Sequence, residues 1–313
     1  MDVFVEDTFI SGITTTIFIA PFKFICFAVG LYPTLEGSGF YAHFDKAFIV
    51  AFIKIYENMD TLGMITELIT GDKEVLSIRK KHANIALLEN TYTGNKVVKY
   101  NGIVYSRFNK KSIFTHSYWD YFLPLAYIYK NPKILLIGLG GGTMIMQLKT
   151  LFGNEIDLDV VESNIDMVKI AERSVPGIGK NTVICDGAKY VEEKICYYDL
   201  VFLDAYDDLN IPDQFLSEKF VVDVDKAMKN DGILAINYAM TFARSPKLDE
   251  LINKLRTRFA VYKVGNIKAY SNIILIGSKH MAKEEIIEKI KNNMKIDSEN
   301  SFLINAYEEL SEA

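Results

Sequence analysis

The sequence predicts an α/β fold whose core is a doubly wound, mostly parallel sheet of seven strands. An apolar run at residues 134–137 leads into a glycine cluster and then an amphipathic stretch, the order of a buried strand, a tight turn and a helix. Downstream, apolar strand-like runs alternate with helical patterns, which is typical of parallel sheets. Near the C-terminus, two strand-like runs are joined by a link too short for a helical crossover, so they must be antiparallel.

The elements of this sheet follow one another at regular intervals. Its strands are expected at residues 134–138, 158–162, 182–186, 199–205, 232–239, 260–265 and 271–279. The helical patterns between them cover residues 144–152, 165–174, 187–194, 217–229 and 246–258. A dinucleotide-binding fold ends on a parallel strand, so the terminal antiparallel hairpin indicates a different nucleotide-binding fold.

Four parts of the chain are predicted from these patterns. Residues 1–60 form a β-rich extension with one helix at 45–59, and residues 61–130 a small antiparallel unit with a linking helix at 116–129. The Asn101-Gly102 dipeptide between strand-like runs is a strong hairpin signal in that unit. Residues 131–280 are the nucleotide-binding domain, and residues 281–313 a charged helical tail.

Composition excludes several classes of protein. The net charge of −5 and the pI near 5.5 lack the basic footprint of a nucleic-acid-binding protein. Cys26, Cys185 and Cys196 have no CxxC spacing, so neither a disulfide framework nor a metal site is expected, and a cytoplasmic location is favoured. The uncharged run at residues 8–22 is shorter than the roughly 18 residues of a spanning helix, so a membrane anchor is not expected.

Candidate binding residues stand where the predicted strands end. Gly138, Gly140 and Gly142 follow the first strand, and Thr143 occupies the position where a dinucleotide site has glycine. Glu162 ends the second strand, where a carboxylate can accept hydrogen bonds from both ribose hydroxyls. Alternatively, the glycine turn binds no ligand, and Glu162 is an ordinary surface glutamate.

Two further strand ends are also acidic. Asp186 and Gly187 follow the third strand, where an acid could meet an adenine amino group or simply cap the next helix. Asp204 ends the fourth strand, and Asp207 follows it closely. Because ligands lie outside the carboxyl ends of the strands in such sheets, these residues converge on one crevice.

This pattern of residues limits the ligands that the predicted site can bind. An adenosine held at the ribose without a pyrophosphate contact indicates S-adenosylmethionine or its decarboxylated form, whose sulfonium is favoured by nearby aspartates. Transfer from a sulfonium is a displacement in which the enzyme mainly aligns the partners. An amine acceptor must first lose a proton, and Asp204 could accept it.

Four stretches resemble, in order and spacing, the spermidine synthase (polyamine aminopropyltransferase) family, including its spermidine synthase-like branch. They read ILLIGLGGGT, VVESNIDMVKIAE, VICDGAKYV and YYDLVFLDAYDDLNIPDQFLSEKF. The resemblance covers roughly residues 70–280, with IALLENTYTGNKVVKYNGIVYS and HSYWDYFLPLAYIYKNPK upstream. It implies the Rossmann-like fold of class I S-adenosylmethionine-dependent methyltransferases and a homodimer or homotetramer.

The resemblance also implies roles for single residues. By position, Glu162 would bind the ribose, Asp186 and Gly187 the adenine, and Asp204 would accept the proton. Asp207 matches the second aspartate of the family's Asp-x-x-Asp, which holds the amine.

Four positions depart from the family pattern. The family's aspartate after the glycines, which pairs with the donor's amino group, is Thr143 here. The glutamine after the hairpin is Tyr105, and Tyr-His-Glu becomes Tyr118, Trp119 and Asp120. Thr143 would suit the carboxylate of intact S-adenosylmethionine. The other positions still make an acidic, aromatic pocket for a polyamine, with Trp119 available for a cation–π contact.

Three functions are therefore considered. The first is aminopropyl transfer from decarboxylated S-adenosylmethionine to an amine or polyamine, with Asp204, Asp207 and Tyr118 as catalytic residues and Tyr105, Trp119 and Asp120 at the substrate. The second is methyl transfer from intact S-adenosylmethionine, favoured by Thr143. The third is a non-catalytic adenosine-binding protein.

Overall fold

The computed structural model describes residues 70–178, 182–208, 210–239, 246–264 and 272–313, together with the two-residue strands β1 (Leu35–Glu36) and β2 (Gly39–Phe40). The expectations for the helix at 45–59, for the uncharged run at 8–22 and for Cys26 lie outside the described residues. In the described part of the chain, no helix is both long and apolar enough to cross a bilayer. Two compact units divide the chain, one of Met1–Lys73 with Glu89–Tyr92 and one of Glu74–Leu88 with Thr93–Ala313. The second unit contains all the candidate site residues.

A large mixed sheet forms the centre of the second unit, in the order β14-β12-β13-β11-β10-β7-β8-β9. Its strands are β7 (Lys133–Ile137), β8 (Asp157–Glu162), β9 (Thr182–Ile184), β10 (Tyr198–Leu203), β11 (Met228–Ala239), β12 (Ala260–Lys263), β13 (Asn272–Ser278) and β14 (Ser311–Glu312). The strands β7 to β11 are parallel to one another, and β13 pairs antiparallel with both β11 and β12. The predicted parallel sheet with a terminal antiparallel hairpin is thus confirmed.

The sheet has one strand more than the seven predicted. After α10 (Lys283–Asn293) and α11 (Ser301–Glu308), the chain ends in β14, which pairs antiparallel with β12. The sequence predicts the helical tail but not this strand, because two residues are too few to show an alternating pattern.

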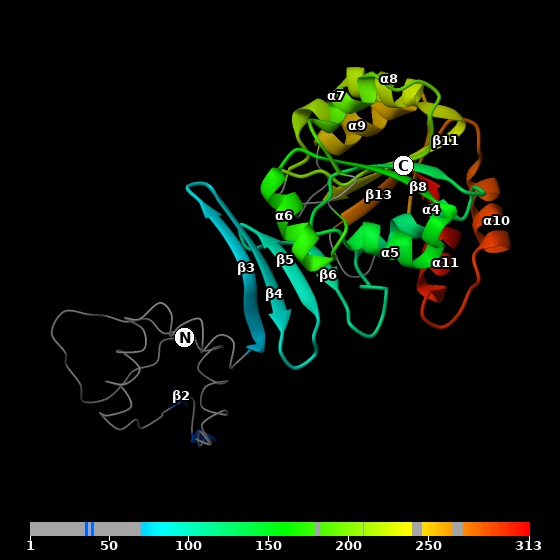
Figure 1. Cartoon of the computed structure of the whole chain (residues 1–313). Coiled ribbons are helices and arrows are strands. Elements are labelled where there is room, and N and C mark those ends of the chain that lie inside the picture. The colour runs from blue at the N-terminus through cyan, green and yellow to red at the C-terminus, as the bar shows by residue number, and fades with distance from the viewer. Residues whose placement is uncertain are drawn as a thin grey trace. The chain divides into compact units, whose positions relative to one another are not determined.

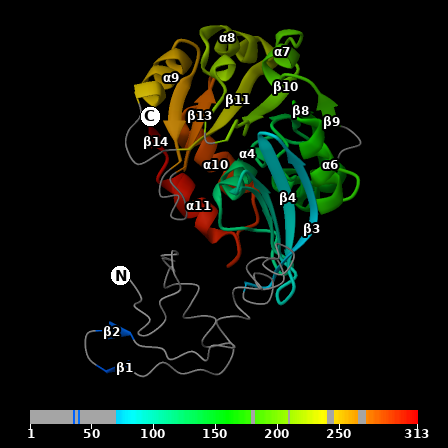
Figure 2. The ribbon, with the colours of Figure 1, turned by 90° about the vertical axis from the view of Figure 1, so that its left-hand side faces the viewer.

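Helices cover both faces of the sheet, as doubly wound folds require (Figure 1). The helices between the strands are α5 (Thr143–Phe152), α6 (Ile165–Ser174), α7 (Gly187–Glu192), α8 (Glu218–Ala227) and α9 (Pro246–Arg256). Figure 2 shows α7, α8 and α9 on one side of the sheet and α10 and α11 on the other. Two separate hydrophobic clusters fill these layers, and β10 is buried along its whole length between them. Burial on both faces explains why the parallel strands read as continuous apolar runs.

A smaller antiparallel sheet precedes the large one, in the order β3-β4-β5-β6. Its strands are β3 (Asp72–Lys80), β4 (Ala83–Asn90), β5 (Lys96–Tyr100) and β6 (Ile103–Phe108). Asn101 and Gly102 both have positive φ, 48° and 85°, as the predicted tight hairpin requires. The polar strand β3 lacks a clear apolar alternation and is not predicted from sequence.

The helix predicted at residues 116–129 is shorter and is split in two. The structure has a 3₁₀ turn, η1 (Tyr118–Phe122), followed by the single helical turn α4 (Leu123–Ala126). Pro124 lacks a backbone N–H, so it fits only near the start of a helix, where no intrahelical bond is lost. The prediction of one continuous helix here is therefore wrong.

Candidate active site

The glycine turn between β7 and α5 lets two other chain segments approach closely. Gly138 has φ of 95°, and a Cβ there would lie 2.3 Å from the carbonyl oxygen of Asp204. A Cβ on Gly140 (φ 51°) would lie 2.7 Å from the carbonyl oxygen of Tyr105, and Gly142 has φ of 96°. The glycines are therefore required by the backbone around the turn, whatever they contact in a ligand.

Strand β6 is bonded to this turn by two side-chain hydroxyls. The amide of Gly141 donates to Ser106 Oγ at 2.6 Å. The Thr143 hydroxyl accepts from the Arg107 amide and donates to the Arg107 carbonyl oxygen, both at 3.0 Å. Thr143 is buried and donates its one hydroxyl proton to Arg107, so the hydroxyl has no proton left for the predicted contact with a donor carboxylate. Ser106 was not predicted, because a single serine in a strand carries no signal.

Glu162 extends from the end of β8 to the glycine turn. Its Oε2 accepts from the Leu139 amide at 2.9 Å, and its Oε1 accepts from the Asn164 amide at 2.8 Å. Burial raises the pKa of this carboxyl, while the hydrogen bonds from Leu139, Asn164 and Ser163 oppose that rise. These bonds hold the carboxylate beside the glycine turn, and the ribose contact stays a prediction.

Asp186 caps helix α7, the structural alternative that the sequence left open. Its Oδ1 accepts from the amides of Ala188 and Lys189, at 2.8 and 3.3 Å. Its Oδ2 accepts from the side chain of Gln214 at 3.2 Å. A Cβ on Gly187 would lie 2.3 Å from Ile137 Cγ2, so this glycine allows α7 to pack against β7. The cap and an adenine contact are compatible, and the latter stays a prediction.

Asp204 lies just beyond β10 and is mostly buried. Its Oδ1 accepts from the Asn237 amide group at 2.8 Å, and its Oδ2 lies 3.4 Å from the Tyr118 hydroxyl. The Trp119 indole also donates to this carboxylate. Burial raises the pKa of Asp204 from 3.8 to about 6, although these three donors favour the ionised form.

Asn237 is a site residue that the sequence prediction missed. It is 2% exposed within β11, in the otherwise apolar run GILAINYA. A buried amide needs hydrogen-bond partners, so a lone asparagine in such a run is a signal that could have found it.

Trp119 and Asp120 both have hydrogen-bond partners within the protein. Trp119 is buried, its ring lies 4.4 Å from that of Tyr118, and its indole N–H is turned to Asp204. The indole N–H thus holds the acid, and the expected cation–π contact of the ring with an amine stays a prediction.

The Asp120 carboxylate is fully buried and has its own hydrogen-bond partners. It accepts from the Thr115 amide and hydroxyl, the His116 amide and the side chain of Gln147. Its lone pairs are used within the protein, so the predicted substrate contact is replaced by a role in fixing the loop before η1. Burial raises its pKa, against the effect of these hydrogen bonds.

The loop after Asp204 is held by the hairpin between β5 and β6. Asn101 donates to the Asp208 carboxylate at 2.9 Å, and the Tyr105 hydroxyl donates to the Asp208 carbonyl oxygen at 2.9 Å. Asp207 forms a backbone bridge to Asn210 and exposes its carboxylate. Burial and the nearby acids raise the pKa of Tyr105, so it remains a neutral hydrogen-bond donor.

These contacts bring together most of the predicted site. The glycine turn, Glu162 and Asp204 meet at the carboxyl ends of β7, β8 and β10, with Tyr105 and Tyr118 beside the acid. Among the described residues, no cluster of His, Cys, Asp and Glu has a metal-binding arrangement.

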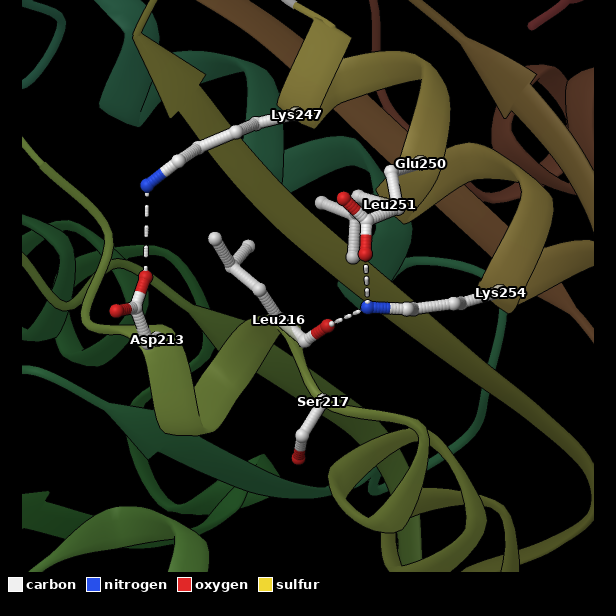
Figure 3. A pocket seen from close by; sticks show the side chains of 7 residues that line it. All are labelled: Asp213, Leu216, Ser217, Lys247, Glu250, Leu251 and Lys254. Carbon is white, nitrogen blue, oxygen red and sulfur yellow. Dashed lines mark hydrogen bonds and ion pairs between the residues drawn. The ribbon is translucent and has the colours of Figure 1, made fainter.

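A pocket of about 290 Å³ lies elsewhere, between η4 (Asp213–Leu216) and α9. In Figure 3 its lysines face groups of the protein itself: Lys247 lies 3.5 Å from Asp213. Lys254 donates to Glu250 and to the Leu216 carbonyl oxygen. None of the predicted site residues lines this pocket.

Known proteins share both sequence and fold with this chain. The spermine/spermidine synthase domain family matches residues 121–295, more than half of the chain. A polyamine aminopropyltransferase from Vibrio vulnificus is 30% identical over 149 residues, which cover 45% of this chain and 48% of the relative. The chain thus spans about half the length of this relative. A polyamine aminopropyltransferase from Thermoanaerobacter sp. is 24% identical over 227 residues, 68% of this chain and 80% of the relative.

Two solved structures are similar in fold. One is a spermidine synthase in complex with the transition state analogue AdoDATO, with a TM-score of 0.58 and 18% identity over 75% of this chain and 84% of that one. The other is the spermidine synthase from Thermotoga maritima, with a TM-score of 0.56, 18% identity and the same coverage. The similarity in fold agrees with the match of the domain family. The chain therefore belongs to the spermine/spermidine synthase family, a family of transferases.

Proposed function

We propose that this chain transfers an aminopropyl group from decarboxylated S-adenosylmethionine to an amine or polyamine, and that Asp204 accepts the proton of the amine. The single observation that carries this proposal is the Asp204 carboxylate, held at the end of β10 by Asn237, Trp119 and Tyr118. The match to the spermine/spermidine synthase domain and the names of the aminopropyltransferase relatives support the reaction class.

The proposed reaction is a displacement at carbon. When bound, the donor supplies a sulfonium, so the C–S electrons return to sulfur as the amine lone pair forms the new C–N bond. An ammonium has no free lone pair, and Asp204 takes its proton. With a pKa of about 6, the acid is ionised at neutral pH and still basic enough to accept that proton. Tyr118 and Trp119 fix the carboxylate, while Asp207 presents an exposed acid to a cationic substrate.

The donor site would be formed by the glycine turn, Glu162 and Asp186. Glu162 supports this placement, because two backbone amides orient its oxygens beside the glycine turn. The argument for intact S-adenosylmethionine was the Thr143 hydroxyl, which is bonded to the backbone of Arg107 instead. These bonds weaken the support that the Thr143 hydroxyl gives to methyl transfer.

Calorimetric titration with each donor tests this choice. The decarboxylated donor is expected to bind more tightly than intact S-adenosylmethionine, because acids surround the site and the carboxylate of the intact form would be repelled. Glu162→Gln is expected to weaken both donors, since it removes the charge at the ribose position. Tighter binding of the intact form would contradict aminopropyl transfer. Failure of both donors to bind would instead support a non-catalytic role.

The pH profile of the wild-type enzyme should show the raised pKa of Asp204. We expect kcat/KM for the decarboxylated donor, at saturating amine, to fall about tenfold per pH unit below pH 6. The value of kcat/KM falls on the acid side because protonation of Asp204 below this pKa removes the proton acceptor. Assays at pH 7.5 after incubation at each lower pH would control for denaturation. A profile that stays flat down to pH 4 would contradict the assignment of Asp204.

Homodimer or homotetramer formation and a cytoplasmic location follow from the resemblance and the composition, and remain part of this proposal. Sedimentation of the purified chain would test the first.

A further inference from the structure

Two asparagines from neighbouring strands lie side by side next to Asp204. In the antiparallel pair of β11 and β13, Asn237 is opposite Ile274, and Asn272 is opposite Ala239. Because side chains alternate along a strand, Asn237 and Asn272 project from the same face as diagonal neighbours. Asn237 is 2% exposed, so its amide is shielded from water and depends on protein partners.

A chain of hydrogen bonds runs from Asn272 to the proposed proton acceptor. Asn272 Nδ2 donates to Asn237 Oδ1 at 2.7 Å, and Asn237 Nδ2 donates to Asp204 Oδ1 at 2.8 Å. A primary amide has one oxygen and one NH₂ group on opposite sides. Once the oxygen accepts from Asn272, the NH₂ group must face Asp204.

The backbone around this pair is also held in place. The Tyr206 hydroxyl donates to the Asn237 carbonyl oxygen and accepts from the Ala239 amide, both at 2.7 Å. These bonds join the end of β11 to the loop that starts at Asp204. The Asn237 side chain therefore has little freedom except rotation of its amide, which is the one motion that Asn272 restrains.

We propose that Asn272 is a positioning residue for Asp204, acting through the orientation of the Asn237 amide; this rests on the proposed function. If the amide of Asn237 were reversed, its oxygen would face the carboxylate, and two acceptors would repel each other. The ionised acid would lose a donor, so it would hold its proton at higher pH.

Other groups that face Asp204 are mostly neutral phenols. Tyr118 on η1, Tyr105 on β6 and Tyr206 on its own loop interact with it electrostatically. The acids Asp207 and Asp208 follow in the same loop and act on Tyr105. In the part of the chain that the structure describes, no lysine, arginine or histidine forms an ion pair with Asp204. The hydrogen bond from the Asn237 amide therefore contributes strongly to stabilising the ionised Asp204 carboxylate, and it forms only when the NH₂ group faces Asp204.

The variant Asn272→Asp tests the proposal by reversing the polarity of the first bond. A carboxylate at 272 can only accept, so it takes the Asn237 NH₂ group and turns the amide oxygen to Asp204. We expect the acid limb of kcat/KM to move up by about half to one pH unit, with a three- to tenfold loss near pH 6. Above pH 8, where Asp204 is ionised in both enzymes, activity should approach that of the wild type.

Asn154→Asp is the matched control, because it makes the same change in charge at an exposed turn between α5 and β8. Asn272→Ala removes the hydrogen bond to Asn237 without adding a charge. It should shift the acid limb of kcat/KM in the same direction, but by less. If Asn272→Asp lost activity by the same factor at every pH, Asn272 would have a merely structural role and the proposal would be overturned. Coinciding profiles for Asn272→Asp and Asn154→Asp would also overturn it.

A readout that needs no turnover separates this inference from the proposed function. The ¹³C resonance of the Asp204 carboxyl, assigned by its loss in Asp204→Asn, can be titrated in wild type, Asn272→Asp, Asn272→Ala and Asn154→Asp. A higher midpoint in Asn272→Asp and also in the uncharged Asn272→Ala, but not in Asn154→Asp, would support the positioning role even if aminopropyl transfer failed. An unchanged midpoint would contradict it even in an active enzyme.

Discussion

Replacing Asp204 with asparagine is expected to reduce kcat for aminopropyl transfer by a factor of about 10³. The asparagine side chain keeps the shape of the acid but cannot accept a proton from the amine. Donor binding should change little, because Glu162 and Asp186 lie at the ends of other strands. The measurement is kcat with saturating donor and amine at pH 8, together with calorimetric titration of the donor.

The stability of this variant should fall by no more than about 1–3 kcal/mol, because the amide has one oxygen for the three donors that face it; a variant that stays folded separates a catalytic effect from misfolding. The pKa of Asp204 is raised from 3.8 to about 6 in the folded protein. The contribution of this acid to the free energy of unfolding therefore falls as pH rises from about 4 to 6. Above pH 6 the buried charge destabilises the fold, so Asp204→Asn has no electrostatic cost there. Asp213→Asn, at an exposed position on η4, is a control that should retain full activity. Turnover of Asp204→Asn within tenfold of the wild type would contradict the assignment.

Gly138→Ala is expected to destabilise the protein by about 3 kcal/mol and to abolish most of the activity. Two costs combine here: a φ of 95°, which residues with a Cβ rarely adopt, and a Cβ 2.3 Å from the carbonyl oxygen of Asp204. The neighbouring contacts are backbone atoms of Asp204 and Ala205, which cannot move without displacing the acid. Thermal or urea unfolding measures the first effect, and the transfer assay measures the second.

Gly153→Ala is the matched control for this substitution. Gly153 also has a positive φ, 56°, but a Cβ there would have no atom within 4 Å. With ψ of −120°, it should cost only backbone strain of about 1–2 kcal/mol and leave activity intact. Equal losses of stability in the two variants would show that the close approach to Asp204 has no energetic consequence.

The parallel sheet could be predicted because its strands are buried on both faces and bounded by turns. The run at β7 and the glycines after it leave few alternatives to strand, turn and helix. The two-residue strand β14 and the polar strand β3 could not be predicted, because their pairing depends on the folded core rather than on their own residues. Position at a strand end also located Asp204 and Glu162 correctly beside the glycine turn.

The hydrogen-bond partners of the polar side chains at the site could not be predicted from the sequence. Trp119, Asp120 and Thr143 occupy positions next to the site, yet each bonds to a group of the protein. Spacing along the chain places a backbone, but the partner of a polar side chain depends on segments distant in sequence. Gln147 and the backbone of Arg107 are such partners.

The small sheet restrains the loop that follows Asp204, and this has a consequence for any shortened form of the chain. Asn101 and Tyr105, at the hairpin between β5 and β6, both bond to Asp208, four residues after Asp204. A chain reduced to residues 131–313 would keep every strand of the large sheet but lose these restraints, as well as the contact of Ser106 with the glycine turn. We therefore expect the large sheet to need the hairpin between β5 and β6 if the loop after Asp204 is to keep its conformation.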